Sequence, residues 1–245
     1  MAELPPVVAR MWDREPTTRR GPRPRLDLAT ITMAAIEIAD TEGLAAVSMS
    51  NVAAQVGVAP MALYRYVGSK DELLTVMADS AVPPPPERAN LSWRAYLATW
   101  TRLTRDLLLS RPWLLDLRQS IPPMGPRRLL WLDRALDALS GTGLDDGQKF
   151  NAATVLTGYA LTDATLKHSL GAGGKELAAR AKGGATEYGE ILTEVLDPAT
   201  YPALSAMMRS GLLRDSTGWT EDADFRFGLD LLLDGIEALI ARPAR

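Results

Sequence analysis

Tyrosine and basic side chains gather in one short stretch, "GVAPMALYRYVGSKDELL", which covers residues 57–74. Tyr64, Arg65 and Tyr66 follow one another there, and Lys70 comes four residues later. A solvated helix would carry more charge, and a buried helix would avoid three consecutive side chains with polar ends. Hydroxyl and cationic groups are the donors with which proteins bind phosphate oxygens. The alternative is that the two tyrosines only cover a small core.

The distribution of charge separates the first third of the chain from the rest. The formal net charge of the 245 residues is only −3. Residues 1–25 nevertheless contain six arginines against three acids, whereas residues 26–82 contain only Arg65 and Lys70 against seven acids. Because a clustered basic footprint matters more for binding an anionic partner than the total charge, these cations stand out.

Local capping signals predict the helices that would position this stretch. Apolar residues recur at three- and four-residue spacing and alternating strand patterns are almost absent, so we expect an all-α protein. Asp27 can cap a first helix that ends at Gly43, and Ser48 can cap a second helix that ends at Gly57. A very short third helix begins near Pro60, which suits a first helical turn.

A fourth helix and a joint follow the third helix. Ser69 and Glu72 form a predicted capping box in which Glu72 returns to the amide of Ser69. The segment "VPPPPERAN" (82–90) cannot continue a helix and marks a joint between two parts. Beyond it we expect helices at 91–110, 127–140, 146–170, 174–197, 201–210 and 221–241.

The second and third predicted helices have the spacing of a helix-turn-helix. Ala53 is small enough for close helix crossing, Gly57 can adopt the left-handed backbone of a sharp turn, and Leu63 can anchor the second helix. With the following "LYRYVGSKDELL", residues 26–80 resemble the DNA-binding domain of TetR-family transcriptional repressors. The resemblance implies a recognition helix over 59–66 that enters the major groove of double-stranded DNA.

The same resemblance implies roles for individual residues. Pro60, Met61 and Ala62 would face base edges, Tyr64 and Tyr66 would contact phosphates, and Lys70 would bind a phosphate at the start of the fourth helix. Tyr66 departs from the family, in which this position is often histidine. Because the first turn offers no Arg, Asn or Gln for bidentate readout, further candidates come from the preceding helix, the recognition helix and the N-terminal arm: Ser50, Asn51, Arg65, Arg23 and Arg25.

We divide the chain into a disordered basic arm (1–25), a helix-turn-helix domain (26–82) and a helical regulatory domain (83–245). The arm, with Arg19 and Arg20 also in it, either reaches a minor groove or makes no defined contact. The stretches at 102–115 and 224–242 resemble the regulatory domain of tetracycline-repressor-like members. This resemblance implies that the domain dimerises and binds a small inducer.

The last predicted helix is apolar on more than one side and therefore must bury more than one side. We expect part of it to form the interface of a homodimer, together with the helix at 146–170; the alternative is a central helix of a monomeric core. The predicted interface residues are Phe225, Phe227, Leu231, Gly235 and Ala238.

Aromatic and apolar side chains of the regulatory domain are candidates for an inducer pocket, although most could be plain core. An apolar or aromatic ligand is expected, and the predicted ligand-binding residues are Trp100, Trp113, Trp131, Tyr159 and Asp163. His168 is the only histidine and no cysteine is present, so neither a metal site nor another cofactor is predicted.

Other classes of function are less well supported. The chain has no HExxH, phosphate loop or DDxxD motif that would indicate an all-α enzyme. It lacks a long apolar run and a signal-peptide core, so we expect a cytoplasmic protein without a membrane partner. We predict a ligand-responsive repressor that binds a palindromic operator as a homodimer; the alternative is a DNA-binding regulator without a ligand.

Overall fold

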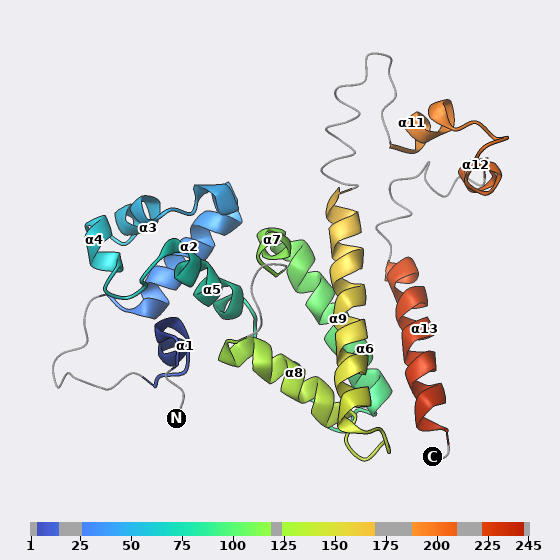
Figure 1. The fold of residues 1–245 in the computed structure, drawn as a ribbon, viewed down its shortest axis with the longest axis horizontal. Coiled ribbons are helices and arrows are strands. Elements are labelled where there is room, and N and C mark those ends of the chain that lie inside the picture. Colours follow the sequence, from blue (N-terminus) through green and yellow to red (C-terminus); the bar gives the residue numbers. More distant parts are fainter. Residues whose placement is uncertain (1–3, 15–25, 119–123, 170–187, 210–221, 243–245) are drawn as a thin grey trace. The chain divides into compact units, whose positions relative to one another are not determined.

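The computed structural model describes residues 4–14, 26–118, 124–169, 188–209 and 222–242. Every regular element in these ranges is a helix, in agreement with the predicted all-α class (Figure 1). None of the helices in these ranges is long and apolar enough to cross a membrane. Contacts divide the chain into a first unit (1–92 with 110–139) and a second unit (93–109 with 140–245).

The helices of each unit follow the order of the chain. The first unit contains α1 (Pro6–Met11), α2 (Leu28–Glu42), the short 3-10 helix η1 (Leu44–Ala46), α3 (Met49–Gln55), α4 (Pro60–Leu63), α5 (Lys70–Ser80), α7 (Trp113–Arg118) and α8 (Pro126–Ala138). The second unit contains most of α6 (Trp93–Ser110), with α9 (Asp146–His168), α11 (Tyr188–Val195), α12 (Pro202–Arg209) and α13 (Asp222–Ile240).

The predicted helix starts are confirmed by hydrogen bonds. The side chains of Asp27, Ser48 and Ser69 each accept the backbone amide three residues further on, at 2.8, 3.1 and 3.1 Å. The capping box differs in one partner, because Glu72 Oε2 accepts the amide of Gly68 at 2.8 Å and not that of Ser69. A Cβ at residue 68 would lie 3.1 Å from this oxygen, so glycine leaves room for the carboxylate.

The core of the first unit lies where α2, α3, α4 and α5 meet. It consists of aliphatic side chains at three- and four-residue spacing, so each helix turns one face inward. Burial of each large aliphatic side chain stabilises the fold by roughly 1.5–3 kcal/mol. The side chains with no more than 1% exposure here include Ile31, Ala35, Val52, Ala53, Leu63, Val67, Leu73 and Met77.

The prediction of a disordered arm over residues 1–25 is wrong for residues 6–11, which form α1. An isolated helix of six residues is not stable in water, so contacts with the rest of the unit must hold it. Figure 1 shows α1 beside α2 and α5, and α1 contacts α5. The arginines at 19, 20, 23 and 25 lie outside the described residues.

The contacts also differ from the predicted domain boundary at residue 82, because α7 and α8 belong to the first unit. Polar groups of these helices reach back across the boundary. Trp113 Nε1 donates to Asp40 Oδ1 at 2.7 Å, and Arg127 Nη1 donates to the carbonyl of Ser80 at 2.8 Å. Trp131 Nε1 donates to the carbonyl of Pro83, directly after the boundary, at 2.6 Å. Arg111 adds an ion pair with Asp40 at 3.2 Å. Such long-range partners leave no periodic signal in the sequence.

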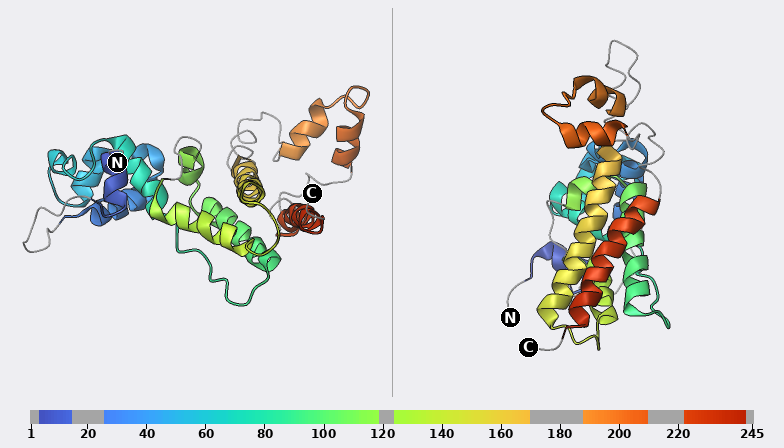
Figure 2. Two further views of the ribbon diagram at one scale, coloured as in Figure 1. Left: turned by 60° about the horizontal axis from the view of Figure 1, so that its bottom comes forward. Right: turned by 90° about the vertical axis from the view of Figure 1, so that its right-hand side faces the viewer.

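In the second unit, α9 and α13 run side by side and antiparallel (Figures 1 and 2). The buried residues of α9 are Ala153, Leu156, Ala160 and Ala164, and Tyr159 of α9 contacts α13 through its ring and hydroxyl. The buried residues of α13 are Phe225, Leu229, Leu233 and Ile236.

Candidate nucleic-acid interface and regulatory site

The turn between α3 and α4 has the geometry of a helix-turn-helix. Gly57 has a φ of +72°, in the left-handed region that glycine adopts without steric cost. Directly after it, the amide of Val58 donates to the carbonyl of Ala53 at 2.9 Å and closes the turn. Ala53 and Leu63 are 0% exposed, so the small residue and the anchor lie where the spacing predicts.

The recognition element is shorter than the predicted helix over 59–66. Regular α-helix covers only Pro60–Leu63, and the chain continues as a turn through Tyr66. The amides of Tyr66 and Val67 both donate to the carbonyl of Leu63, at 2.8 and 3.0 Å. These bonds hold the two tyrosines in one compact turn directly after the helix.

Several predicted DNA contacts in this element are open to solvent. Met61 is 75% exposed and Tyr64 is 45% exposed, and Arg65 and Lys70 are exposed as well. Pro60 is exposed, whereas Ala62 and Tyr66 are half-buried. The side chains that fill the core at this point are Leu63 and Val67, so Tyr64 is not needed to cover it.

The preceding helix α3 carries two of the predicted DNA contacts, and one of them, Asn51, is already bonded within the fold. Ser50 is exposed. Asn51 is also exposed, but its side-chain amide donates to the carbonyl of Ala46 at 2.8 Å, and its backbone amide is capped by Ser48. Asn51 therefore secures the start of α3.

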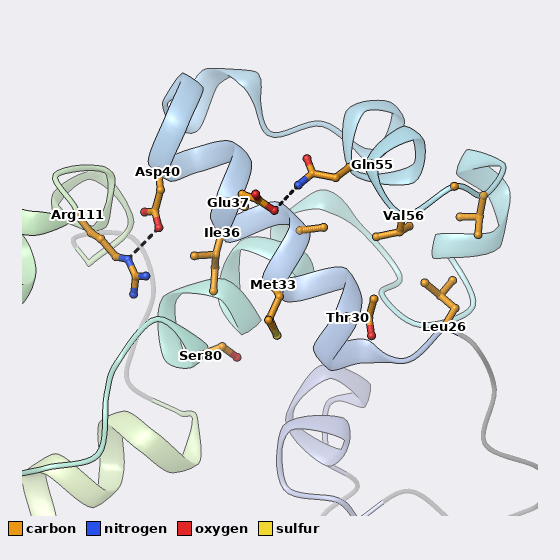
Figure 3. A pocket seen from close by; sticks show the side chains of 13 residues that line it. Leu26, Thr30, Met33, Ile36, Glu37, Asp40, Gln55, Val56, Ser80 and Arg111 are labelled. Carbon is orange, nitrogen blue, oxygen red and sulfur yellow. Dashed lines mark hydrogen bonds and ion pairs between the residues drawn. The ribbon is translucent and has the colours of Figure 1, made fainter.

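A groove of about 920 Å³ lies along α2 on the first unit (Figure 3). Its walls include Met33, Ile36 and Val56, and two polar pairs line it: Gln55 donates to Glu37 at 2.7 Å, and Arg111 pairs with Asp40. None of the predicted ligand-binding residues lines this groove.

A buried charge cluster lies in the second unit between α6 and α9. Arg105 is 3% exposed, and its Nε donates to Asp163 Oδ2 at 2.7 Å. Lys167 Nζ is 3.7 Å from the same oxygen and has no hydrogen-bond acceptor among the described residues. Removing one member of such a buried pair typically costs about 3–5 kcal/mol, because it leaves an uncompensated charge.

Two aromatic rings adjoin this cluster. Tyr159 stacks on Phe225 with ring centroids 5.1 Å apart, and its hydroxyl donates to the carbonyl of Phe225 at 3.0 Å. The guanidinium carbon of Arg105 lies 4.4 Å from the centre of the Phe225 ring, in cation–π geometry. Burial, and then the nearby carboxylate of Asp163, raise the pKa of Tyr159, so its phenol stays protonated at neutral pH.

The structure divides the five predicted ligand-binding residues between the units. Tyr159 and Asp163 belong to one cluster in the second unit, and Trp100, 3% exposed, lies on α6 of that unit. Trp113 and Trp131 lie in the first unit, where each is 6% exposed and anchors its helix through the indole N–H. Sequence reasoning missed Arg105 and Lys167. The four-residue spacing of Asp163 and Lys167 could have indicated that these two residues pair, whereas Arg105 and Asp163 are 58 residues apart.

The predicted dimer residues differ in exposure. Phe227 is 70% exposed and Leu231 is 58% exposed, and Gly235 and Ala238 are also exposed. Phe225 is only 2% exposed, because its ring packs inside the second unit. The chain's own packing therefore already covers Phe225 and leaves the other four uncovered.

The described residues contain no group of three or more His, Cys, Asp or Glu side chains that could hold a metal ion. His168 is exposed in the last turn of α9. A cationic side chain at this position would interact favourably with the helix dipole.

A helix-turn-helix with an exposed recognition turn (60–66), joined to a larger helical part, is typical of DNA-binding transcriptional regulators. Residues 31–77 match the family model described as bacterial regulatory proteins, tetR family, and residues 85–240 match the tetracyclin repressor-like C-terminal domain. The chain belongs to the TetR family. It is a transcriptional regulator and not an enzyme.

Named relatives agree with this assignment. The chain is 34% identical to the HTH-type transcriptional repressor DrrR1 of Streptomyces coeruleorubidus, over 95% of this chain and 85% of that protein. It is similar to the Streptomyces coelicolor TetR family protein ActR in complex with actinorhodin, with 25% identity, a TM-score of 0.69 and coverage of 89% and 99% of the two chains. A possible TetR family regulator of Streptomyces coelicolor A3(2) is 27% identical, with a TM-score of 0.68 and coverage of 87% and 100%.

Proposed function

We propose that the protein represses transcription by binding a palindromic operator as a homodimer, and that a small apolar or aromatic inducer releases it. The observation that carries the DNA part is the exposed recognition turn with Met61 and Tyr64, followed by the exposed Lys70 at the start of α5. The relative DrrR1 is named a repressor, and the similar ActR is known in complex with actinorhodin. A chromosomal DNA partner implies the cytoplasm as the compartment.

On the DNA, Pro60, Met61 and Ala62 face base edges in the major groove. Tyr64 and Tyr66 donate hydroxyls to phosphates, and Lys70 binds a phosphate at the first turn of α5. The other proposed contacts are Ser50, Arg65 and, from the arm, Arg23 and Arg25. Asn51 contributes by holding α3 in place, since its amide group is already bonded to Ala46.

The homodimer forms through the outer faces of α9 and α13. Exposed apolar side chains on both helices support this proposal, because large apolar side chains left in water favour association. They are Phe150 and Val155 on α9, and Phe227 and Leu231 on α13. Gly235 and Ala238 add small side chains that allow close helix approach.

The inducer binds in the second unit beside Trp100, Tyr159 and the Arg105–Asp163 pair. Because Asp163 is already paired with Arg105, it orients the guanidinium and does not itself capture a cationic ligand. The buried ammonium nitrogen of Lys167 lacks a hydrogen-bond acceptor among the described residues, and a ligand oxygen would supply one. Trp113 and Trp131 act as anchors of α7 and α8.

Selection from a pool of random DNA duplexes tests the operator proposal. We expect the wild-type protein to enrich an inverted repeat whose half-sites are about one or two helical turns apart, as a two-fold symmetric dimer requires. Met61→Gln should change the enriched bases, since an amide can pair with adenine. Met33→Gln, at the 70% exposed Met33 on α2, is the matched control and should enrich the wild-type sequence. No enrichment by the wild type would refute the proposal.

A ligand screen tests the inducer. A compound that releases the enriched duplex must itself bind more weakly in the presence of that duplex, by the same factor, because the two binding equilibria are linked. Equal affinities with and without duplex would exclude that compound as an inducer. If no apolar or aromatic compound of a broad library releases the duplex, the regulator without a ligand becomes the better description.

A further inference from the structure

The N-terminal helix α1 lies outside the matched helix-turn-helix region, 31–77. Its best-anchored side chain is Arg10, whose exposure is 21%. Arg10 Nη1 donates to the carbonyl of Tyr66 at 2.9 Å and to Glu72 Oε2 at 3.3 Å. These partners are 56 and 62 residues away in the sequence.

Tyr66 and Glu72 belong to the segment that joins the recognition turn to α5. Tyr66 ends the recognition turn, and Glu72 lies in the first turn of α5. The same Glu72 oxygen also accepts the amide of Gly68, so one carboxylate holds the turn and the arginine together. Arg10 therefore connects the end of the recognition turn with the start of α5.

The residues that follow Arg10 contact the start of α8. Trp12 Nε1 donates to the carbonyl of Met124 at 2.9 Å. The side chains of Met11 and Asp79 both crowd Gly125, which leaves no space for a side chain there. Asp79 is 4% exposed, and its carboxylate accepts the amides of Arg127 and Arg128, at 3.2 and 2.8 Å, in the first turn of α8.

We propose that α1 braces the recognition turn against the start of α8, and that Arg10 is a positioning residue for operator binding. The brace is a second connection between these two places, in addition to α5 itself. Because its guanidinium is engaged inside the first unit, Arg10 acts on DNA through Tyr66 and Glu72 and makes no phosphate contact of its own. This inference rests on the proposed operator binding.

The test uses the full-length protein, the duplex selected by the wild type and a shuffled duplex of equal length. A phosphate contact and a positioning residue differ in salt dependence, since each phosphate contact adds about one unit to the slope of log affinity against log salt. We expect Arg10→Ala to weaken binding to the selected duplex at least about tenfold and binding to the shuffled duplex much less. The slope of log affinity against log salt should stay unchanged. Arg10→Lys should restore part of the affinity, because the ammonium keeps the charge and the hydrogen-bond donors but sits on a shorter side chain without the planar guanidinium.

Arg14→Ala is the matched control, because it removes the same charge from the same segment. The side chain of Arg14 is exposed and makes no hydrogen bond or ion pair with the described residues. We expect Arg14→Ala to leave the ratio of the affinities for the selected and shuffled duplexes unchanged. Trp12→Phe, which keeps an aromatic ring but removes the N–H donor, should reduce the ratio in the same direction as Arg10→Ala.

Three results would overturn the proposal. The first is an Arg10→Ala affinity within about twofold of the wild type. The second is an equal loss on both duplexes with a slope lower by about one, which would make Arg10 a phosphate contact. The third is an unchanged ratio of the affinities for the selected and shuffled duplexes in both Arg10→Lys and Glu72→Gln. These milder variants provide the test if Arg10→Ala fails to fold, which the loss of its helical circular dichroism would show. A wild type that selects no duplex would instead refute the proposed function.

Discussion

At the scale of single residues, the recognition turn separates side chains that hold the fold from side chains that face solvent. Leu63 and Val67 are buried, whereas Tyr64 between them is 45% exposed. Lys70 is exposed at the first position of α5, where the positive end of the helix dipole adds to its charge. Asp71 and Glu72 in the same turn partly offset the positive helix end. The ammonium of Lys70 therefore supplies most of the attraction for a phosphate.

We predict that Lys70→Ala weakens binding to every duplex by a similar factor. A phosphate contact carries no sequence information, and its loss lowers the slope of log affinity against log salt by about one. Titrations of selected and shuffled duplexes at several salt concentrations measure both quantities. Lys70→Arg keeps the charge and should keep the slope. An unchanged affinity in Lys70→Ala would show that α5 does not approach the DNA with its first turn.

At the scale of elements, α2, α3, α5 and α9 begin at side-chain caps, and the chain turns sharply at Gly57. Gly57 has a φ of +72° and no heavy atom within 4 Å of the place where a Cβ would be. A substitution there would meet backbone strain alone. Gly158, within α9, also has open space at its Cβ position but a helical backbone. The two glycines therefore isolate the effect of backbone conformation.

The substitutions Gly57→Ala and Gly158→Ala should change stability in opposite directions. The left-handed backbone costs an alanine about 1–2 kcal/mol, so Gly57→Ala should lower the melting temperature by a few degrees. Alanine in a helix interior is favoured over glycine by about 0.5–1 kcal/mol, so Gly158→Ala should raise it. Thermal unfolding at one fixed protein concentration makes the comparison. Equal shifts for both variants would contradict the assigned turn geometry.

At the scale of the whole molecule, association depends on apolar surface that the single chain leaves uncovered. Phe227 and Met33 are both 70% exposed, the first on α13 of the second unit and the second on α2 of the first unit. Only Phe227 lies on the proposed dimer face. A charge placed at each position therefore separates a specific interface from a general effect on solubility.

We predict that Phe227→Glu shifts the protein toward monomer, whereas Met33→Glu leaves the dimer intact. A glutamate on the proposed dimer face loses apolar contact and would take an unpaired charge out of water on association. Sedimentation velocity over a range of concentrations measures the shift. The monomeric variant should also lose most of its affinity for a two-half-site operator, since each half-site is then bound separately. A dimer of unchanged stability in Phe227→Glu would place the interface elsewhere.

Interactions within a few residues of one another were predictable from the sequence. The caps at Asp27, Ser48 and Ser69 each involve an amide three residues away, and the turn at Gly57 depends on one left-handed residue. Apolar spacing of three and four residues then determined the helices and the all-α class. These features depend on neighbours along the chain, which the sequence lists directly.

The tertiary structure decided what depends on partners far along the chain. Arg10 binds residues 56 and 62 positions away, so a segment that resembles a disordered tail forms α1. Trp113 and Trp131 are predicted pocket residues, and only the folded chain shows that their indole groups also anchor α7 and α8. Periodicity showed that α13 has more than one apolar side, yet it could not tell the buried Phe225 from the exposed Phe227. The choice between two apolar faces depends on which neighbouring helix covers them, and only the folded chain brings that helix into contact.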